Sequence, residues 1–361
     1  LKCQIKQKLL TTLKHITFGG RQLMSKNNIK KIFTNKLKET YLIAEIGNNH
    51  NGSIKLAKKM IMAAKKNGAD CVKFQTFSSK SLFIEKFLKK NIRLKKDVEK
   101  FVLKLSDFKL LKKFSEKNKI DFAATPFSPE EVNYLINKLN VNFIKIASMD
   151  INNYPLITYI AKKKIPIVLS TGFGSKKEII QAVKIIKKYK TKFALLHCVS
   201  EYPPQDRSIN LNRILKLKKM FGVPVGFSDH TLGLDVPRAA ISLGANIVEK
   251  HFTLNQKMKG WDHSISMNPK ELKIISLFKK KIKTIMGKNK IYRVESKKNT
   301  IAFRRSIVAS KIINKGEKIL FSDLSFKRPG NGFPPGQWKK IVGKIAKRKI
   351  NYDEQINSSN I

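Results

Sequence analysis

The sequence is poor in cysteine, tryptophan and acidic residues, and it has no long apolar runs. Its 361 residues include 3 Cys and 2 Trp. Cys71 and Cys198 lie inside apolar runs, where a thiol behaves as a small hydrophobic group, so a disulfide framework is not expected. No run approaches the roughly 20 apolar residues that a membrane-spanning helix needs. We therefore expect a soluble, cytoplasmic protein that has no membrane partner.

The shortage of acidic residues leaves the chain strongly basic. Asp and Glu total 25 against 75 Lys and Arg, which gives a formal net charge of +50. Such an excess of positive charge can bind nucleic acids, anionic lipids or acidic substrates. The lysines are spread over nearly every polar helix face, as at Lys58, Lys59 and Lys65, and form no single stripe with interleaved aromatics. We interpret the charge as a lysine-rich composition and expect no nucleic-acid partner, although the field can help to steer an anionic substrate.

Residues 1–37 are predicted to form an N-terminal tail outside the folded domains. Leu1 to Arg21 are basic and contain no acidic residue, a composition that faintly resembles a transit peptide. The chain begins with Leu, however, and Met24 is a natural start shortly before the first strong strand pattern. For the residues before Met24 we favour an upstream extension over a disordered tail or a targeting segment.

The middle of the chain alternates short β-branched or aromatic runs with helical patterns. Each run is followed by a turn and then by a helical pattern, which predicts a parallel α/β fold. Eight runs within about 210 residues suit a (β/α)8 barrel. The runs are residues 41–47, 71–77, 121–127, 143–148, 166–172, 193–199, 224–230 and 246–253.

Start and stop signals place helices between these runs. Ser53 can cap a helix with an apolar stripe from Ala57 to Ala64, and Ser175 with Glu178 is typical of a capping box. The stretch from Ser78 to Lys100 has no clear strand pattern, and we predict a long loop there with a helical portion over the barrel mouth.

The predicted barrel domain covers residues 38–286 and ends with a helix from Pro269 to Met286. Residues 287–303 are predicted to be a linker. Residues 304–361 show short strands and turns rich in Gly and Pro, which indicate a second, small domain. Because so short a segment buries little core, we expect this domain to lean on another surface.

Polar residues gather where the predicted strands end. In a barrel these ends converge on one mouth, and only every second strand residue points inward. Ionisable groups rarely enter a core unless they are paired or functional, so inward polar pairs predict a functional pocket. The pairs are Lys73 with Gln75, Ser228 with His230, and Glu249 with His251.

Two histidines at this mouth suggest a metal site. His230 and His251 end neighbouring predicted strands, and two imidazoles one strand apart can hold one divalent cation while leaving positions for water and substrate. Either histidine alone is more often a satisfied core residue. The pair predicts a metal, because Asp229 and Glu249 are near enough for supporting hydrogen bonds.

Lysines and hydroxyl groups surround the same expected cavity. The Gly/Ser turn at residues 170–175 is weak evidence, because most strand-to-helix turns contain these residues. The lysines are stronger evidence, because lysine seldom lies inside a strand unless it is paired or functional. The set predicts a site for a phosphate and a carboxylate on one small molecule. The set is Lys73, Lys145, Ser148, Ser170, Thr171 and Ser228.

Taken in order, the motifs resemble the sialic acid synthase family. The similarity runs from about Tyr41 to the C-terminus, and several independent motifs in the right order make it specific. The motifs lie at residues 45–52, 72–76, 125–127, 145–148, 169–172, 196–198, 227–231, 249–253 and 327–332.

The resemblance implies a TIM barrel followed by an antifreeze-like domain of the β-clip type. It also implies a domain-swapped homodimer in which the small domain caps the partner's barrel. The implied reaction condenses phosphoenolpyruvate with N-acetylmannosamine or a related acylamino sugar and releases phosphate by C–O cleavage. The cofactor would be a divalent metal, most often Mn²⁺, with Mg²⁺ or Co²⁺ as further possibilities.

The resemblance also implies roles for individual residues. His230 and His251 would bind the metal, and Glu45 would stabilise positive charge at C2 or activate the water that adds there. Arg328 would reach the sugar's acyl group from the other subunit. Phosphoenolpyruvate would be held by Lys73, Lys145, Ser148, Ser170 and Ser228, and the sugar would lie near Glu45, Gln75, Tyr202 and Asp262.

Two positions depart from the family pattern, and both lie toward the substrates. Asp150 and Ser200 stand where bacterial sialic acid synthases commonly have Glu and Asn. These positions therefore leave the identity of the sugar substrate undecided. A legionaminic or pseudaminic acid synthase acting on a deoxy diacetamido hexose is the main alternative. A pyruvate-dependent aldolase with a Schiff-base lysine and a non-catalytic basic binder are further alternatives.

Overall fold

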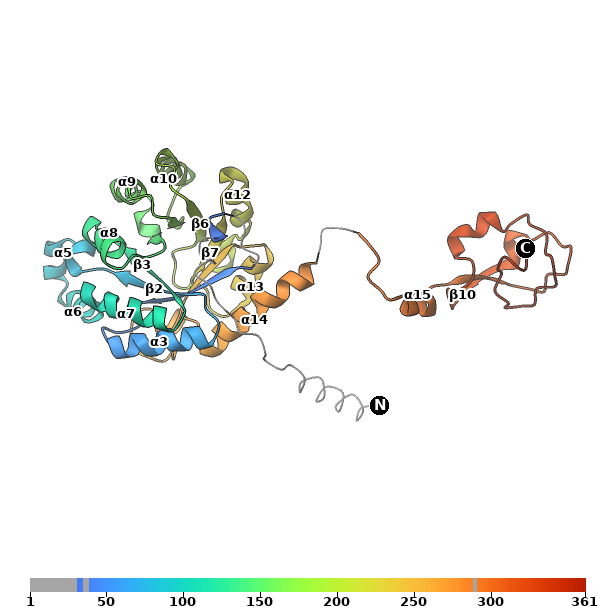
Figure 1. Cartoon of the computed structure of the whole chain (residues 1–361), viewed down its shortest axis with the longest axis horizontal. Helices are drawn as coiled ribbons and strands as arrows, with labels where there is room; N and C mark the ends of the chain where they lie inside the picture. The colour runs from blue at the N-terminus through green and yellow to red at the C-terminus, as the bar shows by residue number, and fades with distance from the viewer. Residues whose placement is uncertain (1–30, 35–38, 288–290) are drawn as a thin grey trace. The chain divides into compact units, whose positions relative to one another are not determined.

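The computed structural model describes residues 31–34, 39–287 and 291–361. The chain divides after Gly287 into two compact units. The first contains an eight-stranded sheet surrounded by helices (Figure 1), and the second contains a two-stranded antiparallel sheet. Within the described ranges, no helix is long and apolar enough to cross a membrane.

The eight strands of the first unit form a near-closed parallel barrel. They follow the order β3-β2-β1-β8-β7-β6-β5-β4 with parallel ladders throughout, and β3 also contacts β4. This confirms the predicted (β/α)8 fold, and each predicted run contains one strand. The strands are β1 Tyr41–Gly47, β2 Cys71–Thr76, β3 Asp121–Pro126, β4 Ile144–Ile146, β5 Ile167–Ser170, β6 Phe193–Cys198, β7 Val225–Asp229 and β8 Ile247–His251.

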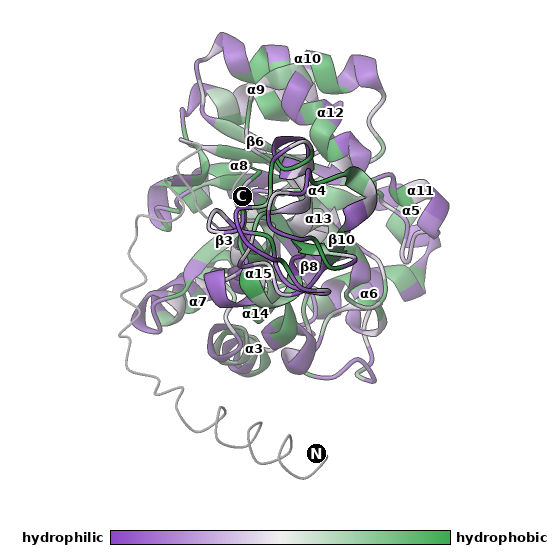
Figure 2. Cartoon of the chain, turned by 90° about the vertical axis from the view of Figure 1, so that its right-hand side faces the viewer, coloured by the Kyte–Doolittle hydropathy of each residue, from purple (hydrophilic) through white to green (hydrophobic). Residues whose placement is uncertain are grey.

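Amphipathic helices cover the outside of the barrel. Ser53 caps α3 by accepting a hydrogen bond from the backbone N–H of Leu56, and the capping box of Ser175 and Glu178 begins α10, as predicted. Figure 2 shows hydrophilic and hydrophobic stretches alternating along α9, α10 and α12. These helices are α3 Ile54–Lys66, α7 Leu105–Lys117, α8 Pro129–Asn133, α9 Tyr154–Lys162, α10 Lys176–Lys188, α11 Asp206–Ile209, α12 Asn212–Phe221, α13 Asp235–Ser242 and α14 Pro269–Met286.

The segment from Ser78 to Lys100 is more regular than the sequence predicts. It forms three short helices, α4 Ser79–Leu82, α5 Glu85–Lys90 and α6 Ile92–Phe101. Apolar side chains of α4 and α6 share a small core with Phe77 and Phe127, which follow β2 and β3. Helices this short are marginal alone, so this packing is what stabilises them.

Part of the predicted N-terminal tail packs into the barrel. Most of residues 1–37 lie outside the described ranges, but Ile32 is fully buried in a cluster with Tyr41 and Ile43. The ring centroid of Phe33 lies 6.5 Å from that of Phe143. The prediction of a tail is therefore wrong for residues 31–34, whose apolar side chains fill the N-terminal end of the barrel.

The barrel interior changes from apolar to polar along the strands, as β1 and β2 show. Ile43 and Cys71 belong to the buried interior cluster. Two residues further along, the same inward faces of β1 and β2 present Glu45 and Lys73 to a cavity. One end of the barrel is thus a packed core, and the other carries the polar side chains.

The second unit is small but has its own core. Strands β9 Ser306–Ala309 and β10 Leu324–Lys327 pair antiparallel, and apolar residues from both strands and the following turns pack together. The predicted linker, residues 287–303, is not wholly irregular, because helix α15 occupies Lys297–Phe303. Short 3-10 turns, η4 Phe321–Asp323 and η5 Pro335–Lys340, complete the unit.

We predict that Ile32→Ala lowers the free energy of unfolding by about 2–4 kcal/mol, because it leaves a cavity at the end of the barrel. Denaturant unfolding measures the change. Ile84→Ala is the matched control: Ile84 is 77% exposed, so its loss should stay within about 0.5 kcal/mol. Equal effects for the two variants would show that residues 31–34 do not pack as described.

Candidate active site

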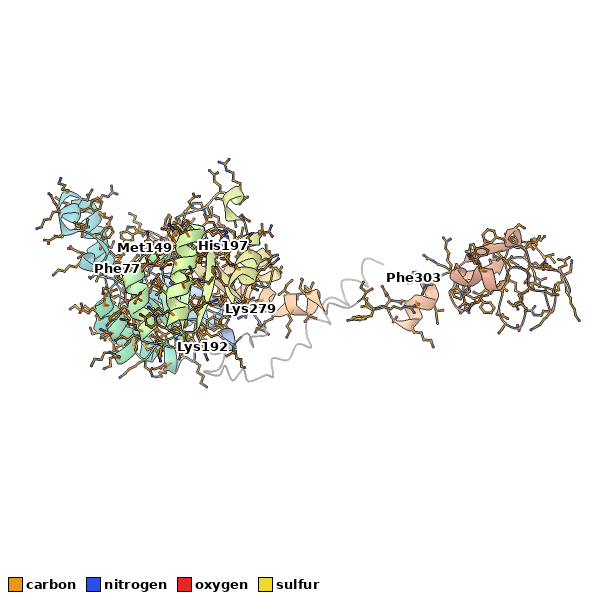
Figure 3. The ribbon with its side chains drawn as sticks, turned by 90° about the horizontal axis from the view of Figure 1, so that it is seen from above. Phe77, Met149, Lys192, His197, Lys279 and Phe303 are labelled. Atoms are coloured by element: carbon orange, nitrogen blue, oxygen red, sulfur yellow. The ribbon has the colours of Figure 1, made fainter. Side chains whose placement is uncertain are left out.

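A cavity of about 420 Å³ lies at the C-terminal ends of the barrel strands. Phe77 and Met149, labelled in Figure 3, are among the residues that line it. Of the predicted site residues in the first unit, all but Asp150 and Thr171 converge here. Those that line the cavity are Glu45, Lys73, Gln75, Lys145, Ser148, Ser170, Ser200, Tyr202, Ser228, His230, His251 and Asp262.

Four buried charged groups form the floor of the cavity. Lys73 Nζ lies 2.6 Å from Glu45 Oε2 and 3.8 Å from Glu249 Oε2. Lys145 Nζ lies 3.4 Å from Glu249 Oε1, which also accepts a hydrogen bond from Ser228 Oγ at 3.0 Å. Two ammonium groups therefore alternate with two carboxylates, and their formal charges cancel.

This ion cluster shifts the pKa values of its members in different directions. Burial lowers the pKa of Lys73, but Glu249 and Glu45 outweigh burial and leave that pKa raised. Burial also lowers the pKa of Lys145, Glu249 offsets only part of this, and Lys73 lowers it further. For Glu249, burial raises the pKa, yet Lys145 and Lys73 bring it below its usual value. The cluster thus favours an ionised Glu249 and makes Lys145 the more easily deprotonated lysine.

The two histidines face each other at the rim of the ion cluster. Their ring centroids are 5.5 Å apart, with an angle of 42° between the ring planes. His230 Nδ1 lies 2.8 Å from the carbonyl oxygen of Val199, a contact that favours a proton on Nδ1 and leaves Nε2 free to bind a ligand. His251 Nδ1 is buried without a hydrogen bond and lies 3.7 Å from Asp262 Oδ2.

The donor set fits a cation that is also bound by water or substrate. Rings at this separation can share one ion at about 2.1 Å from each nitrogen. Among the described residues, no group of three or more His, Cys, Asp or Glu could hold a metal ion. The protein would therefore supply the two imidazoles, and further ligands would come from solution.

Tyr202 closes one side of the histidine pair. Its ring stacks on His230 with centroids 4.1 Å apart and an interplanar angle of 29°. The centroid of the Tyr202 ring is also 6.1 Å from that of His251. The residue is still 53% exposed, so it is available to a molecule that enters the cavity.

Asp229 lies on the other side of its strand from the histidine pair. Its carboxylate accepts hydrogen bonds from Lys250 Nζ at 2.7 Å and from the backbone N–H of Thr231 at 2.9 Å. Ser228 and His230 line the cavity, so the residue between them points outward. Asp229 therefore accepts no hydrogen bond from a metal ligand, contrary to prediction, and Glu249 accepts one from Ser228 and forms ion pairs with the two lysines instead.

Asp150 and Thr171 do not line the cavity, and Thr171 Oγ1 instead donates a hydrogen bond to the carbonyl oxygen of Leu196 at 3.1 Å. Asp150 ends the 3-10 turn η2 (Ser148–Asp150), where one carboxylate oxygen accepts a hydrogen bond from Asn153 Nδ2 at 2.9 Å. Burial raises the pKa of Asp150. Arg328 belongs to the second unit, where its guanidinium lies 5.3 Å from the ring centroid of Phe303.

The cavity also has lining residues that the sequence interpretation did not assign to a substrate. Inward alternation could have identified Thr125 and Cys198, which continue the interior faces of Ala123 and Leu196. The apolar residues of the mouth come mainly from loops, where no periodic pattern marks them. They include Phe77, Leu82, Phe83, Phe127, Met149, Phe173 and Trp261.

Comparison with known proteins assigns the chain to a family. Residues 60–291 match the model of the NeuB family, and residues 304–361 match the SAF domain. The N,N'-diacetyllegionaminic acid synthase of Campylobacter jejuni is 40% identical over 333 residues, which cover 89% of this chain and 99% of that protein. The N-acetylneuraminate-9-phosphate synthase of Drosophila melanogaster is 33% identical over 371 residues, which cover 92% and 99%.

A solved structure agrees with these relatives. The N-acetylneuraminic acid synthetase of Leptospira borgpetersenii, in complex with citrate, is 38% identical with a TM-score of 0.68, and the match covers 73% of this chain and 90% of that one. The sequence and the fold are therefore those of the nonulosonic acid synthase family. The chain belongs to the NeuB family, which confirms the predicted resemblance and the antifreeze-like domain.

Proposed function

We propose that this protein condenses phosphoenolpyruvate with the open-chain form of an acylamino sugar, giving a nonulosonic acid and phosphate. The main support is the burial of Lys73 and Lys145 in the same cavity as Glu45 and the two histidines. Two ammonium groups close together suit a small molecule that carries both a phosphate and a carboxylate.

Phosphoenolpyruvate would bind at the floor of the cavity. Its oxyanions would compete with Glu45 and Glu249 for Lys73 and Lys145, which are already protonated partners of carboxylates. Hydroxyl groups of Ser148 and Ser228 lie on the same wall, with Ser170, whose Oγ is buried without a hydrogen-bond partner. A buried hydroxyl without a partner is costly, so a ligand oxygen there would be stabilised.

His230 and His251 would hold a divalent cation, with Mn²⁺ favoured and Mg²⁺ or Co²⁺ possible. When bound, such an ion supplies Lewis-acid polarisation of the sugar's aldehyde oxygen. Burial lowers the pKa of His251 and so favours the neutral ring, whose nitrogen lone pair can bind a metal. Burial also lowers the pKa of His230, but Cys198 and the carbonyl of Val199 outweigh burial and leave that pKa raised.

The reaction forms one carbon–carbon bond and breaks one carbon–oxygen bond. C3 of phosphoenolpyruvate attacks the aldehyde carbon, and the aldehyde oxygen takes a proton from solvent. Water then adds to the electron-poor C2 and gives one proton to Glu45. The new C2 hydroxyl gives its proton to the departing phosphate as the C–O bond breaks, which leaves a ketone at C2. Glu45 is held for this step by Lys73 at 2.6 Å and by Gln75 Nε2, which donates to Oε1 at 3.3 Å.

A deoxy diacetamido hexose is a second candidate for the sugar, and its product would be a legionaminic or pseudaminic acid. The apolar side chains of Phe77, Phe83 and Phe127 at the cavity mouth suit a sugar that carries methyl groups in place of hydroxyls. The 40% identity to a protein named N,N'-diacetyllegionaminic acid synthase supports the same choice.

We further propose a domain-swapped homodimer in which Arg328 serves the partner's cavity. Arg328 is exposed in the second unit and carries a guanidinium suited to an acyl oxygen. We also propose that the enzyme works in the cytoplasm. The described cysteines, Cys71 and Cys198, are free and buried, as is common in a reducing compartment.

The direct test incubates the protein with phosphoenolpyruvate, Mn²⁺ and either N-acetylmannosamine or a diacetamido trideoxyhexose. We expect one phosphate for each nonulosonic acid formed, measured by a phosphate assay and mass spectrometry, and the ratio of kcat/KM values identifies the preferred sugar. Pyruvate in place of phosphoenolpyruvate should give no product. The absence of phosphate with every acylamino hexose, or turnover with pyruvate, would overturn the proposal.

The metal proposal can be tested without turnover. Mn²⁺ at 100 times its Kd should stabilise the wild-type protein by about 2.7 kcal/mol, seen as a higher Tm. His251→Ala should lose this shift, because one of the two imidazoles is gone. His197→Gln is the matched control, since His197 lies outside the cavity lining and bonds to the carbonyl of Ile209. An undiminished shift in His251→Ala would contradict the assignment.

The lowered pKa of Lys145 predicts the alkaline limb of activity. A lysine binds an oxyanion only while protonated, and its charge is lost as pH rises through its pKa. As the pH rises, the value of kcat/KM for phosphoenolpyruvate should therefore start to decrease before the pH reaches ~10.4, the usual pKa of lysine. Lys145→Arg should move this limb to higher pH, because arginine stays charged. A limb that does not move would assign the titration to another group.

A further inference from the structure

We propose that Phe101 and Trp261 form an aromatic latch that positions Asp262 beside His251 and thereby controls binding of the sugar. We call this pair the latch. The inference rests on the proposed function, in which Asp262 lies near the sugar. Neither ring is assigned a chemical step, so both are positioning residues.

The helices α4–α6 form a separate body over one side of the mouth. Their small core contains Phe77, Val98 and Phe101, and it is distinct from the main core of the barrel. In Figure 1, α5 and α6 lie at the left edge of the first unit, beyond β2. A body with its own core can keep its shape while its contacts with neighbouring loops change.

The C-terminal end of α6 is held at two points. The ring centroids of Phe101 and Trp261 are 4.8 Å apart in an edge-to-face arrangement of 70°, a favourable geometry for aromatic rings. A Cβ atom at Gly52 would lie only 2.2 Å from the carbonyl oxygen of Lys100, so the turn after β1 also touches this helix end. Trp261 thus joins α6 to the loop that follows β8.

The same loop carries Asp262. Its backbone carbonyl accepts a hydrogen bond from Ser266 Oγ at 2.5 Å, and Ser266 Oγ accepts one from Asn49 Nδ2 at 2.8 Å. The loop is tied again at Lys259, whose carbonyl accepts from Asn51 Nδ2 at 2.9 Å. These hydrogen bonds tie the backbone of the loop after β8 to the turn after β1.

The side chain of Asp262 has no comparable restraint. Its Oδ2 atom lies 3.7 Å from His251 Nδ1, which is longer than a hydrogen bond. The neighbouring Trp261 is 40% exposed and lines the cavity, whereas Phe101 is only 5% exposed. Packing against the buried Phe101 ring therefore adds a restraint on the Trp261 side of the loop, next to Asp262, that the backbone hydrogen bonds do not supply.

Loss of the latch should change the KM for the sugar and leave the KM for phosphoenolpyruvate nearly unchanged. The lysines proposed to bind phosphoenolpyruvate stand on strands of the barrel and are far from the latch residues in the sequence. Their positions do not depend on the loop that follows β8. Loss of either latch ring should raise KM for the sugar by about tenfold, the upper range of what one aromatic pair contributes, with KM for phosphoenolpyruvate within about twofold of wild type.

The experiment compares Phe101→Ala, Trp261→Ala and the double variant in steady-state assays with both substrates. Because the rings act on each other, the double variant should be no worse than either single variant. Trp261→Phe, which keeps an aromatic ring, should recover most of the sugar affinity. Phe87→Ala is the matched control, since Phe87 lies on α5, stacks on Phe83 at 6.3 Å and does not line the cavity.

A readout that needs no activity separates the latch from the proposed reaction. The chain has 2 tryptophans, so Trp338→Phe leaves Trp261 as the single emitter. In that background Phe101→Ala should shift the emission to longer wavelength, and Phe87→Ala should not. If the wild type releases no phosphate, the proposed function fails while the emission still tests the contact. Unchanged emission, additive effects, or equal rises in both KM values would overturn the latch.

Discussion

The site depends on four charged side chains that the barrel buries together. A single buried charge costs several kcal/mol, so Lys73 and Lys145 are tolerable only with Glu45 and Glu249 beside them. Strand register creates the Glu45–Lys73 pair, because these residues stand opposite each other across β1 and β2. The ion pairs of Glu249 with Lys73 and Lys145 cross the barrel interior between strands that are not neighbours. The pairing that makes the apo barrel stable also keeps two cations ready for an anionic ligand.

Much of the barrel could be predicted because each strand carries its own local signals. A short apolar run followed by a turn marks every one of the eight strands, even β4, which has only 3 residues. The incorrect predictions of secondary structure and packing have a common cause. Ile32 and the helices α4–α6 are held by contacts with residues far away in the chain, and a local pattern does not record such contacts.

For the site, alternation within strands was a reliable guide and single residues were not. It placed Lys73, Gln75 and the histidines correctly, and it would have turned Asp229 outward had it been applied there. Glu249 is predicted to support the metal because it lies two residues before a histidine. A carboxylate in that position suits several roles. Three-dimensional contacts with lysines from other strands decide between those roles. Loop residues at the mouth follow no period and needed the structure.

In the proposed mechanism, the ion cluster opens to receive phosphoenolpyruvate. The most direct measurement is a crystal structure of the protein with this ligand bound. We predict its phosphate or carboxylate oxygens at about 2.7–3.2 Å from Nζ of both Lys73 and Lys145. A ligand bound elsewhere, with both lysines still paired only with Glu45 and Glu249, would contradict the account.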